Sequence, residues 1–128
     1  MVRNMDLVRE ILLTIEKEYI DSDIHNLKIG NYDMKIIAYH CRILYDAGFV
    51  TNYYAICSDD ELHGFLVGAL TWEGHEFLDK IRDDNTWNKT KEVIKGKGLP
   101  LVLDTIKQIS SAIISEVTKA AIKGLMQN

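Results

Sequence analysis

The stretch LTWEGHEFLDKIRDDNTWNK, from Leu70 to Lys89, reads as the end of a strand, one helix and the start of a second helix. Thr71 stands where an N-cap is needed, because its hydroxyl can accept a backbone N–H that the first helical turn leaves free. A glycine inside a helix costs about 1 kcal/mol relative to alanine, so we expect another element to approach the backbone at Gly74. Residues at the spacing i, i+3, i+4 and i+7 form one apolar face of this helix. They are Gly74, Phe77, Leu78 and Ile81.

Two tryptophans mark the two helices of this stretch. Asn85 is predicted to cap the second helix, and Gly96 to end it in a left-handed turn. Trp87 falls on the apolar side of that helix. Because large aromatic rings dominate core energetics, Trp72 and Trp87 predict a clasp between the two helices.

The chain before Leu70 predicts two helices and a hairpin. Apolar residues recur at helical spacing over Met5–Lys17, a helix that Asn4 is predicted to cap, and over Tyr32–Ala47. The intervening residues 19–31 have a loop composition that leaves room for one short turn of helix or one strand. Two runs rich in β-branched and aromatic residues predict strands joined by a polar tip at residues 58–64, and they are Val50–Cys57 and Phe65–Leu70.

The end of the chain predicts one long helix. Pro100 suits a first helical position, and a broad apolar face runs from Ile106 to Leu125, so we expect a helix of about 25 residues. Such a helix is too apolar to stand alone in water. We therefore expect it to pack on the body or on a second copy, which predicts a homodimer.

Charge is divided unevenly along the 128 residues, whose net charge is −4. Residues 1–85 carry 8 Lys and Arg against 16 Asp and Glu, whereas residues 86–128 carry 7 against 3. Phosphate backbones supply most non-specific affinity for nucleic acid, and an acidic body repels them. Any DNA binding must therefore rely on a local patch.

No membrane segment is predicted. The longest apolar run, Phe65–Leu70, is far short of the roughly 20 residues that span a bilayer. The first ten residues contain no apolar signal region, so we expect a cytoplasmic protein. In that compartment the isolated Cys41 and Cys57 predict free thiols.

The segment Tyr39–Val50, YHCRILYDAGFV, leads straight into the predicted hairpin and resembles the end of a recognition helix entering a β-wing. This order resembles the winged helix-turn-helix domain of bacterial regulators. More closely, the chain resembles domain-of-unknown-function family 2513, found in bacterial genomes and prophages. That likeness rests on MDL at residues 5–7, YH at 39–40, LTWEGH at 70–75, FL at 77–78, RD at 82–83 and WNK at 87–89. It implies a winged-helix-like fold and no particular activity.

A stripe of polar residues on and before the 32–47 helix is the candidate DNA-binding face. A helix in the major groove offers such a stripe to bases and phosphates. The alternative is a solvated helix face. The basic cluster of Lys89, Lys91, Lys95 and Lys97 is likewise interpreted as a solvated face, with phosphate or the acidic body of the protein as its alternative contacts. The candidate residues are Asn31, Lys35, Tyr39 and Arg42.

The predicted hairpin tip carries Asp59, Asp60 and Glu61, where a wing that contacts DNA carries arginine or lysine. These three residues are the candidate protein-interaction site. They support the alternative function, an adaptor or inhibitor that binds a host protein and no DNA.

No catalytic site, metal site or cofactor is predicted. The segment His75–Asp79 nearly matches the zinc motif HExxH, but aspartate replaces the second histidine, so we expect a His75–Asp79 pair instead. His40 lies on an apolar helix face and is interpreted as a core residue. Asp83 and Asp84 are interpreted as helix-end residues, because no acid, base or nucleophile accompanies them.

Together these patterns predict an α+β, mostly helical protein. Residues 1–84 are expected to form a winged-helix-like domain of helix, helix, β-hairpin wing and helix, and residues 85–128 a C-terminal helical extension. The predicted function is non-enzymatic. The first hypothesis is a phage-linked regulator that binds duplex DNA, and the second is a protein-interaction module for a host or phage protein.

Overall fold

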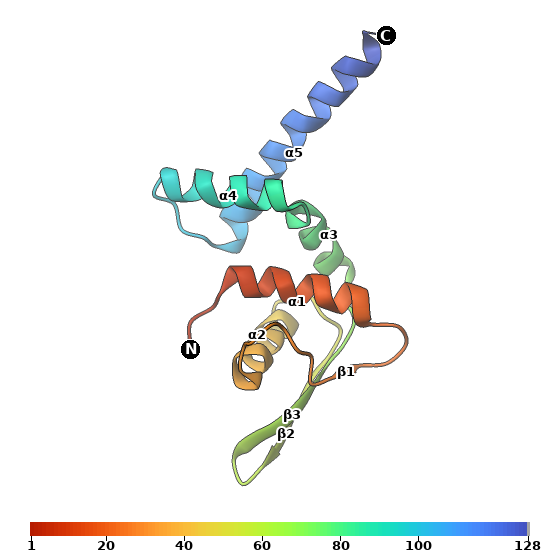
Figure 1. Ribbon diagram of the computed structural model, residues 1–128, viewed down its shortest axis with the longest axis vertical. Coiled ribbons are helices and arrows are strands. Elements are labelled where there is room, and N and C mark those ends of the chain that lie inside the picture. Colours follow the sequence, from red (N-terminus) through yellow and green to blue (C-terminus); the bar gives the residue numbers. More distant parts are fainter. Residues whose placement is uncertain (128) are drawn as a thin grey trace. The chain divides into compact units, whose positions relative to one another are not determined.

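The computed structural model describes residues 1–127, and Figure 1 traces their order. Five helices and a three-stranded antiparallel sheet in these residues confirm an α+β, mostly helical fold. The chain divides into two compact units, Met1–Leu78 and a second unit that starts at Asp79. The elements are α1 (Met5–Glu18), β1 (Ile24–His25), α2 (Met34–Asp46), β2 (Tyr53–Ser58), β3 (Glu61–Val67), α3 (Trp72–Ile81), α4 (Asp84–Gly96) and α5 (Leu103–Met126). None of the helices within residues 1–127 combines the length and apolar character that crossing a bilayer requires.

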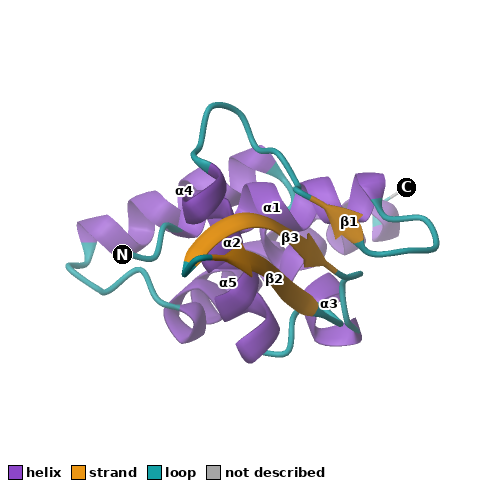
Figure 2. Cartoon of the chain, turned by 90° about the horizontal axis from the view of Figure 1, so that it is seen from below, coloured by secondary structure: helices purple, strands orange, loops and turns teal. Residues whose placement is uncertain are grey.

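The first unit is built on α1, α2 and a sheet of strand order β1-β3-β2. Asn4 caps α1 as predicted, because its side-chain oxygen accepts a hydrogen bond from Leu7 N at 3.2 Å. α1 packs against α2, and α2 packs against β2 and β3, as Figure 2 shows. The central strand β3 buries Phe65 and Val67 completely, and the ring of Tyr53 stacks on Phe65.

Thr71, the predicted N-cap of α3, also holds the chain segment that follows α2. α2 ends at Asp46, the left-handed Gly48 (φ 80°) follows two residues later, and Phe49 N then donates to Leu44 O at 2.9 Å. The Thr71 hydroxyl accepts from Gly74 N at 3.0 Å and donates to Gly48 O at 2.5 Å. One side chain therefore caps α3 and ties it to the end of α2.

The close approach of another element to the backbone of Gly74, which the sequence predicts, is present in the structure. A Cβ atom at this position would lie far closer than 3.0 Å to the carbonyl oxygen of Phe49. The ring of Phe49 stacks on Phe77 one turn later, with centroids 5.3 Å apart. The predicted apolar face of α3 is confirmed, since Gly74, Phe77, Leu78 and Ile81 are all buried.

The hairpin differs from the prediction at its tip. The sequence predicts a polar tip over residues 58–64, but the strands run on to a two-residue turn at Asp59 and Asp60. Both residues adopt positive φ, 53° and 63°, which aspartate tolerates better than most residues because its side chain is short and polar. The register shifts at a β-bulge between Ile56 and Cys57, and Glu61 already belongs to β3.

The second unit corrects three predicted boundaries. Asp83, rather than Asn85, caps α4 by accepting from Thr86 N at 2.8 Å. The left-handed residue after α4 is Gly98 (φ 66°) rather than Gly96. Pro100 precedes α5 without starting it. Several side chains here can cap or end a helix, and spacing alone does not decide among them.

The predicted tryptophan clasp is wrong. Trp87 is buried on α4 as expected, but Trp72 is 76% exposed. Trp72 is the first residue of α3, and the apolar face that α3 buries starts two residues later, at Gly74. Its indole therefore points away from the packed side of the helix.

Candidate interaction surfaces

The polar stripe of α2 lies on the surface. Lys35 and Arg42 are exposed, and Tyr39 is half-buried between them. The guanidinium of Arg42 lies 5.7 Å from the centroid of the Tyr39 ring, a cation–π contact that holds both side chains on one helix face. Asn31 is not part of this helix face, because it lies in the turn that precedes α2.

Acidic residues bracket this stripe. Asp33 caps α2 by accepting from Lys35 N at 3.4 Å, and Asp46 is exposed at the last position of the helix. The stripe therefore offers two cations between two carboxylates. Such an arrangement provides little phosphate neutralisation, which is the main source of affinity for duplex DNA.

The acidic tip, defined as Asp59, Asp60 and Glu61, occupies the far end of the hairpin. All three residues are exposed, and Ser58 pairs with Glu61 to close the turn. The His63 ring lies beside this turn and can donate from Nε2 to Ser58 O at 3.2 Å. In Figure 1 the end of the hairpin extends beyond α1 and α2 of the same unit. The tip is therefore accessible from several directions.

The strand β2 is an edge of the sheet. It pairs with β3 on one side and with no other strand in residues 1–127. Antiparallel strands direct the N–H and C=O groups of every other residue away from the paired neighbour. The outer edge of β2 thus carries backbone groups that are free to pair with another chain.

An apolar sheet face accompanies this edge. Tyr54 is 61% exposed and Ile56 37% exposed, and both face away from the buried side of the sheet. Leu66, the cross-strand neighbour of Tyr54, is half-buried, and His25 on β1 is paired with Leu66 on the same face. The sequence prediction missed this surface. The alternation that places Tyr54 and Ile56 on one side of their strand could have indicated it.

Comparison with known proteins places the chain in a family. A family described as hypothetical proteins (DUF2513) matches residues 2–100, which include the whole hairpin and α4. The chain belongs to this family. It is also 38% identical over 122 residues to a Haemophilus influenzae protein described as uncharacterized, an alignment that covers 91% of this chain and 98% of that protein. No solved structure matches the chain.

The buried polar groups of this DUF2513 protein include a histidine with two structural partners. His40 is fully buried, its Nε2 accepts from Asn4 N at 2.9 Å, and its Nδ1 donates to Ile36 O at 2.8 Å. The prediction of a satisfied core histidine is therefore confirmed. Burial raises the pKa of the Cys41 thiol to about 12, so this thiol stays protonated at neutral pH and is a poor nucleophile.

The suspected metal motif on α3 does not assemble. His75 Nδ1 lies 3.7 Å from Glu16 Oε2, whereas Asp79 pairs with Arg82 at 2.9 Å, so the predicted His75–Asp79 pair is wrong. Across residues 1–127 no three His, Cys, Asp or Glu side chains are grouped to hold a metal ion. The DUF2513 chain uses these residues for surface ion pairs.

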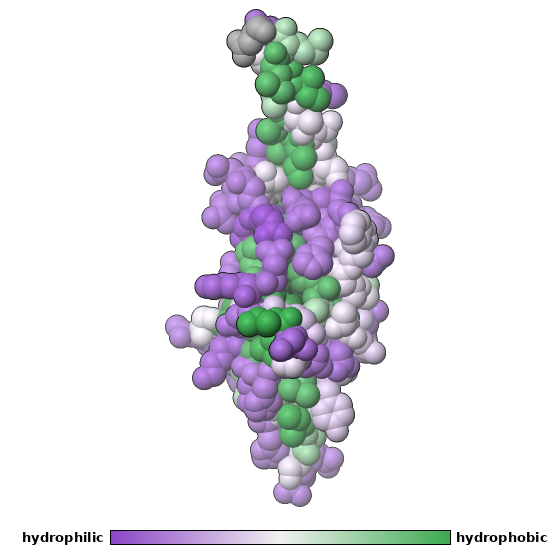
Figure 3. Space-filling view, turned by 90° about the vertical axis from the view of Figure 1, so that its right-hand side faces the viewer, coloured by the Kyte–Doolittle hydropathy of each residue, from purple (hydrophilic) through white to green (hydrophobic). Residues whose placement is uncertain are grey.

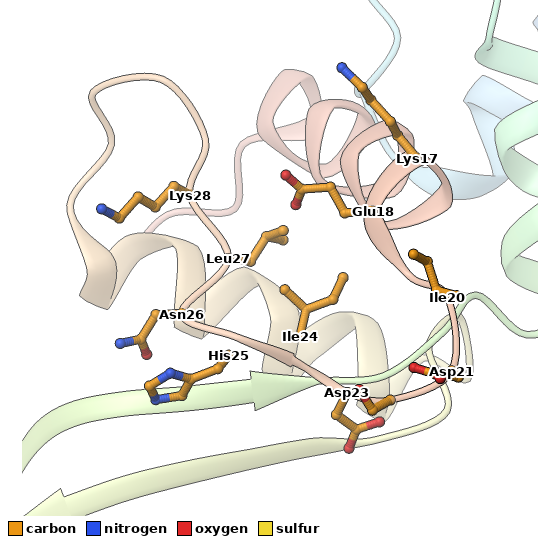
Figure 4. A pocket seen from close by; sticks show the side chains of 11 residues that line it. Lys17, Glu18, Ile20, Asp21, Asp23, Ile24, His25, Asn26, Leu27 and Lys28 are labelled. Carbon is orange, nitrogen blue, oxygen red and sulfur yellow. The ribbon is translucent and has the colours of Figure 1, made fainter.

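A pocket of about 710 Å³ opens beside the loop that joins α1 to β1. Figure 4 shows that its polar side chains diverge, because Lys17, Lys28 and Asp23 point in different directions. Ile20, Ile24 and Leu27 supply its apolar lining. A small-molecule site needs polar groups that converge on one point, and this pocket does not provide them.

An exposed apolar face extends along the C-terminal half of α5. Val117 is 64% exposed and Leu125 75% exposed. A groove of about 510 Å³ between α4 and α5 is lined in part by Ile113, Ile114 and Val117. Figure 3 shows hydrophobic side chains gathered along the upper part of the view, which is α5.

The four basic residues of α4 and its C-terminus lie on the surface, and Lys91 lies over the ring of Trp87.

Proposed function

We propose that this chain is a non-enzymatic, winged-helix-like protein-interaction module whose contact surface is the β2–β3 hairpin. The observation that carries the proposal is the combination of an open β2 edge with the acidic tip at its end. The partner is a host or phage protein of the cytoplasm, where Cys41 and Cys57 remain as thiols.

The order of elements supports the winged-helix-like description. α2 is followed by the left-handed Gly48 and by a short connection to the hairpin that starts at Tyr53, as a recognition helix leads into a wing. The turn before α2 leaves only residues 26–33 for the helix that a full helix-turn-helix places there. The fold is therefore close to a winged helix but shortened at the element that docks the recognition helix on DNA.

Charge favours a protein partner over duplex DNA. The first unit, residues 1–78, contains six Lys and Arg against 13 Asp and Glu, a net charge of −7. Three of these 13 carboxylates lie at the acidic tip, the position where a DNA-binding wing contacts a groove of the duplex. Phosphates would be repelled there, whereas a cationic protein surface would be attracted.

The proposal is tested by affinity capture from host lysate with two baits. The second bait carries Asp59→Asn, Asp60→Gly and Glu61→Gln, which remove the charges but retain residues suited to a left-handed turn. We expect proteins enriched by the wild type to be lost or at least tenfold reduced with the neutral bait. Equal enrichment by both baits, or none by either, would contradict the proposal.

Duplex DNA is the second candidate ligand, because Lys35, Tyr39 and Arg42 form one surface stripe with an ordered Arg42–Tyr39 contact. Fluorescence anisotropy with labelled duplex DNA at low salt tests it. DNA binding through this face would weaken steeply with salt, and Lys35→Ala with Arg42→Ala would reduce the salt slope by about 2. We expect no saturable binding by the wild type.

Self-association through α5 is a separate proposal. Ile113, Val117, Ala120 and Gly124 recur at the 4-3 spacing of a helix–helix seam, and most of this seam is exposed. We expect light scattering at micromolar concentration to give twice the chain mass of 14.6 kDa. Val117→Lys should yield the monomer, whereas Ser115→Lys on the opposite side of α5 should not. A monomeric wild type would contradict this proposal.

A further inference from the structure

We infer that the outer edge of β2 accepts an extended, positively charged segment of the partner as an added antiparallel strand. This inference rests on the proposed function, because it names the chemical class of the segment that the hairpin binds. Strand addition uses main-chain hydrogen bonds for affinity and alternate side chains for specificity.

The backbone of β2 supplies the template. β2 has six residues and one paired side, so about three of its residues direct both N–H and C=O outward. Edge strands of this kind pair readily with another chain unless they are covered or charged. No other strand in residues 1–127 pairs with this edge of β2.

The exposed sheet face supplies the side-chain contacts. Tyr54 and Ile56 lie on one face of β2, next to the edge, and both keep a substantial part of their surface in water. Side chains directly opposite each other on antiparallel strands lie about 4.5–5.5 Å apart between Cβ atoms. Alternate residues of an added strand would therefore pack on Tyr54 and Ile56 and cover them.

The charge of the hairpin determines which segment fits. The chain contains no Lys or Arg between Arg42 and Lys80, so the hairpin has neither residue and carries three carboxylates at its tip. A segment with Lys or Arg near the tip would form charge-assisted contacts with Asp59, Asp60 and Glu61. An acidic or phosphorylated segment would be repelled.

A second copy of this chain is the less suitable occupant. Pairing two β2 edges would add the carboxylates of a second acidic tip to the same interface, and like charges across an interface are unfavourable. The bulge between Ile56 and Cys57 also interrupts the regular register that edge-to-edge pairing needs. Both features restrict self-pairing while leaving the edge open to a cationic segment.

Synthetic peptides test the inference in fluorescence anisotropy with the 128-residue protein. The probe is a labelled peptide of about eight residues that alternates lysine with valine, and a peptide that alternates glutamate with valine is its control. We expect the lysine peptide alone to bind. Binding should weaken by about tenfold with the neutral variant Asp59→Asn, Asp60→Gly, Glu61→Gln, as expected for the loss of a few exposed charge pairs.

Backbone methylation distinguishes strand addition from charge attraction. Two versions of the lysine peptide carry N-methyl groups on alternate residues, either on the valines or on the lysines. An added strand uses only one edge, so one version should bind and the other should fail. Equal binding of both versions, or no binding of the unmethylated lysine peptide, would overturn the inference. Hairpin-dependent capture from lysate without peptide binding would overturn strand addition alone and leave the proposed function standing.

Discussion

Replacing Gly74 with alanine is expected to destabilise the protein by about 3 kcal/mol, the upper end of the usual overpacking cost. In an exposed helix the same substitution stabilises, because alanine has the higher helix propensity. At Gly74 the added methyl group would overlap the carbonyl oxygen of Phe49, which is fixed backbone and itself accepts from Thr71 N at 3.0 Å. Urea denaturation followed by circular dichroism measures the difference.

Gly96 provides the matched control for this substitution. It is the last residue of α4, it lies outside the proposed α5 seam, and no neighbouring atom comes within 4 Å of the position that an added Cβ would take, so Gly96→Ala should stabilise by up to about 1 kcal/mol. The two substitutions are chemically identical and should have opposite signs. A Gly74→Ala protein as stable as the wild type would mean that α3 does not pack on the end of α2.

Replacing His40 with leucine is expected to cost about 2 kcal/mol, although leucine is apolar and of similar size. The substitution leaves the partly buried Asn4 N without its acceptor at the start of α1, and an unsatisfied donor that is shielded from water carries a desolvation penalty of this order. His40 also joins α1 to α2 across 36 residues of sequence. Chemical denaturation of His40→Leu measures the loss.

His40→Gln is the control, because a glutamine oxygen can replace Nε2 as the acceptor for Asn4 N. We expect it to recover part of the loss. Hydrogen exchange should show the first turn of α1 opening more readily in His40→Leu than in the wild type. Unchanged exchange and unchanged stability in His40→Leu would show that the Asn4–His40 bond contributes nothing.

The features predicted correctly from the sequence are those that local spacing determines. Capping preference predicts the role of Thr71, the cost of glycine in a helix predicts a close contact at Gly74, and the helical period predicts the burial of Phe77. Each of these residues has the predicted environment. Asn4 likewise caps α1. These choices depend on residues within one or two turns, which the sequence displays directly.

The predictions are wrong where several residues can take the same capping position, or where the conformation of a turn is not set by its composition. Asp83 and Asn85 can both cap a helix, and only the chain path selects Asp83. Asp59 and Asp60 adopt a left-handed turn that is more common for Asn-Gly, so the hairpin is tighter than its composition suggests. The exposure of Trp72, by contrast, could have been predicted, because helical spacing puts Trp72 on the side of α3 opposite the predicted apolar face.

The candidate surfaces could be predicted only in part. Helical spacing puts Lys35, Tyr39 and Arg42 on one solvent-facing stripe, and their positions on the surface agree with that expectation. The open edge of β2 could not be found in the same way. Strand order is non-local, and β2 becomes an edge only because β1 pairs with the other side of β3.

Photo-crosslinking in cells tests most directly whether the hairpin, rather than the α2 stripe, is the contact surface. A photoreactive phenylalanine analogue would replace Tyr54 on β2 in one variant and Tyr39 on α2 in another, so that both positions carry the same probe on an aromatic site. We expect a covalent protein adduct from position 54 and neither protein nor DNA adducts from position 39. Adducts with DNA from position 39, with none from position 54, would contradict the hairpin as the contact surface.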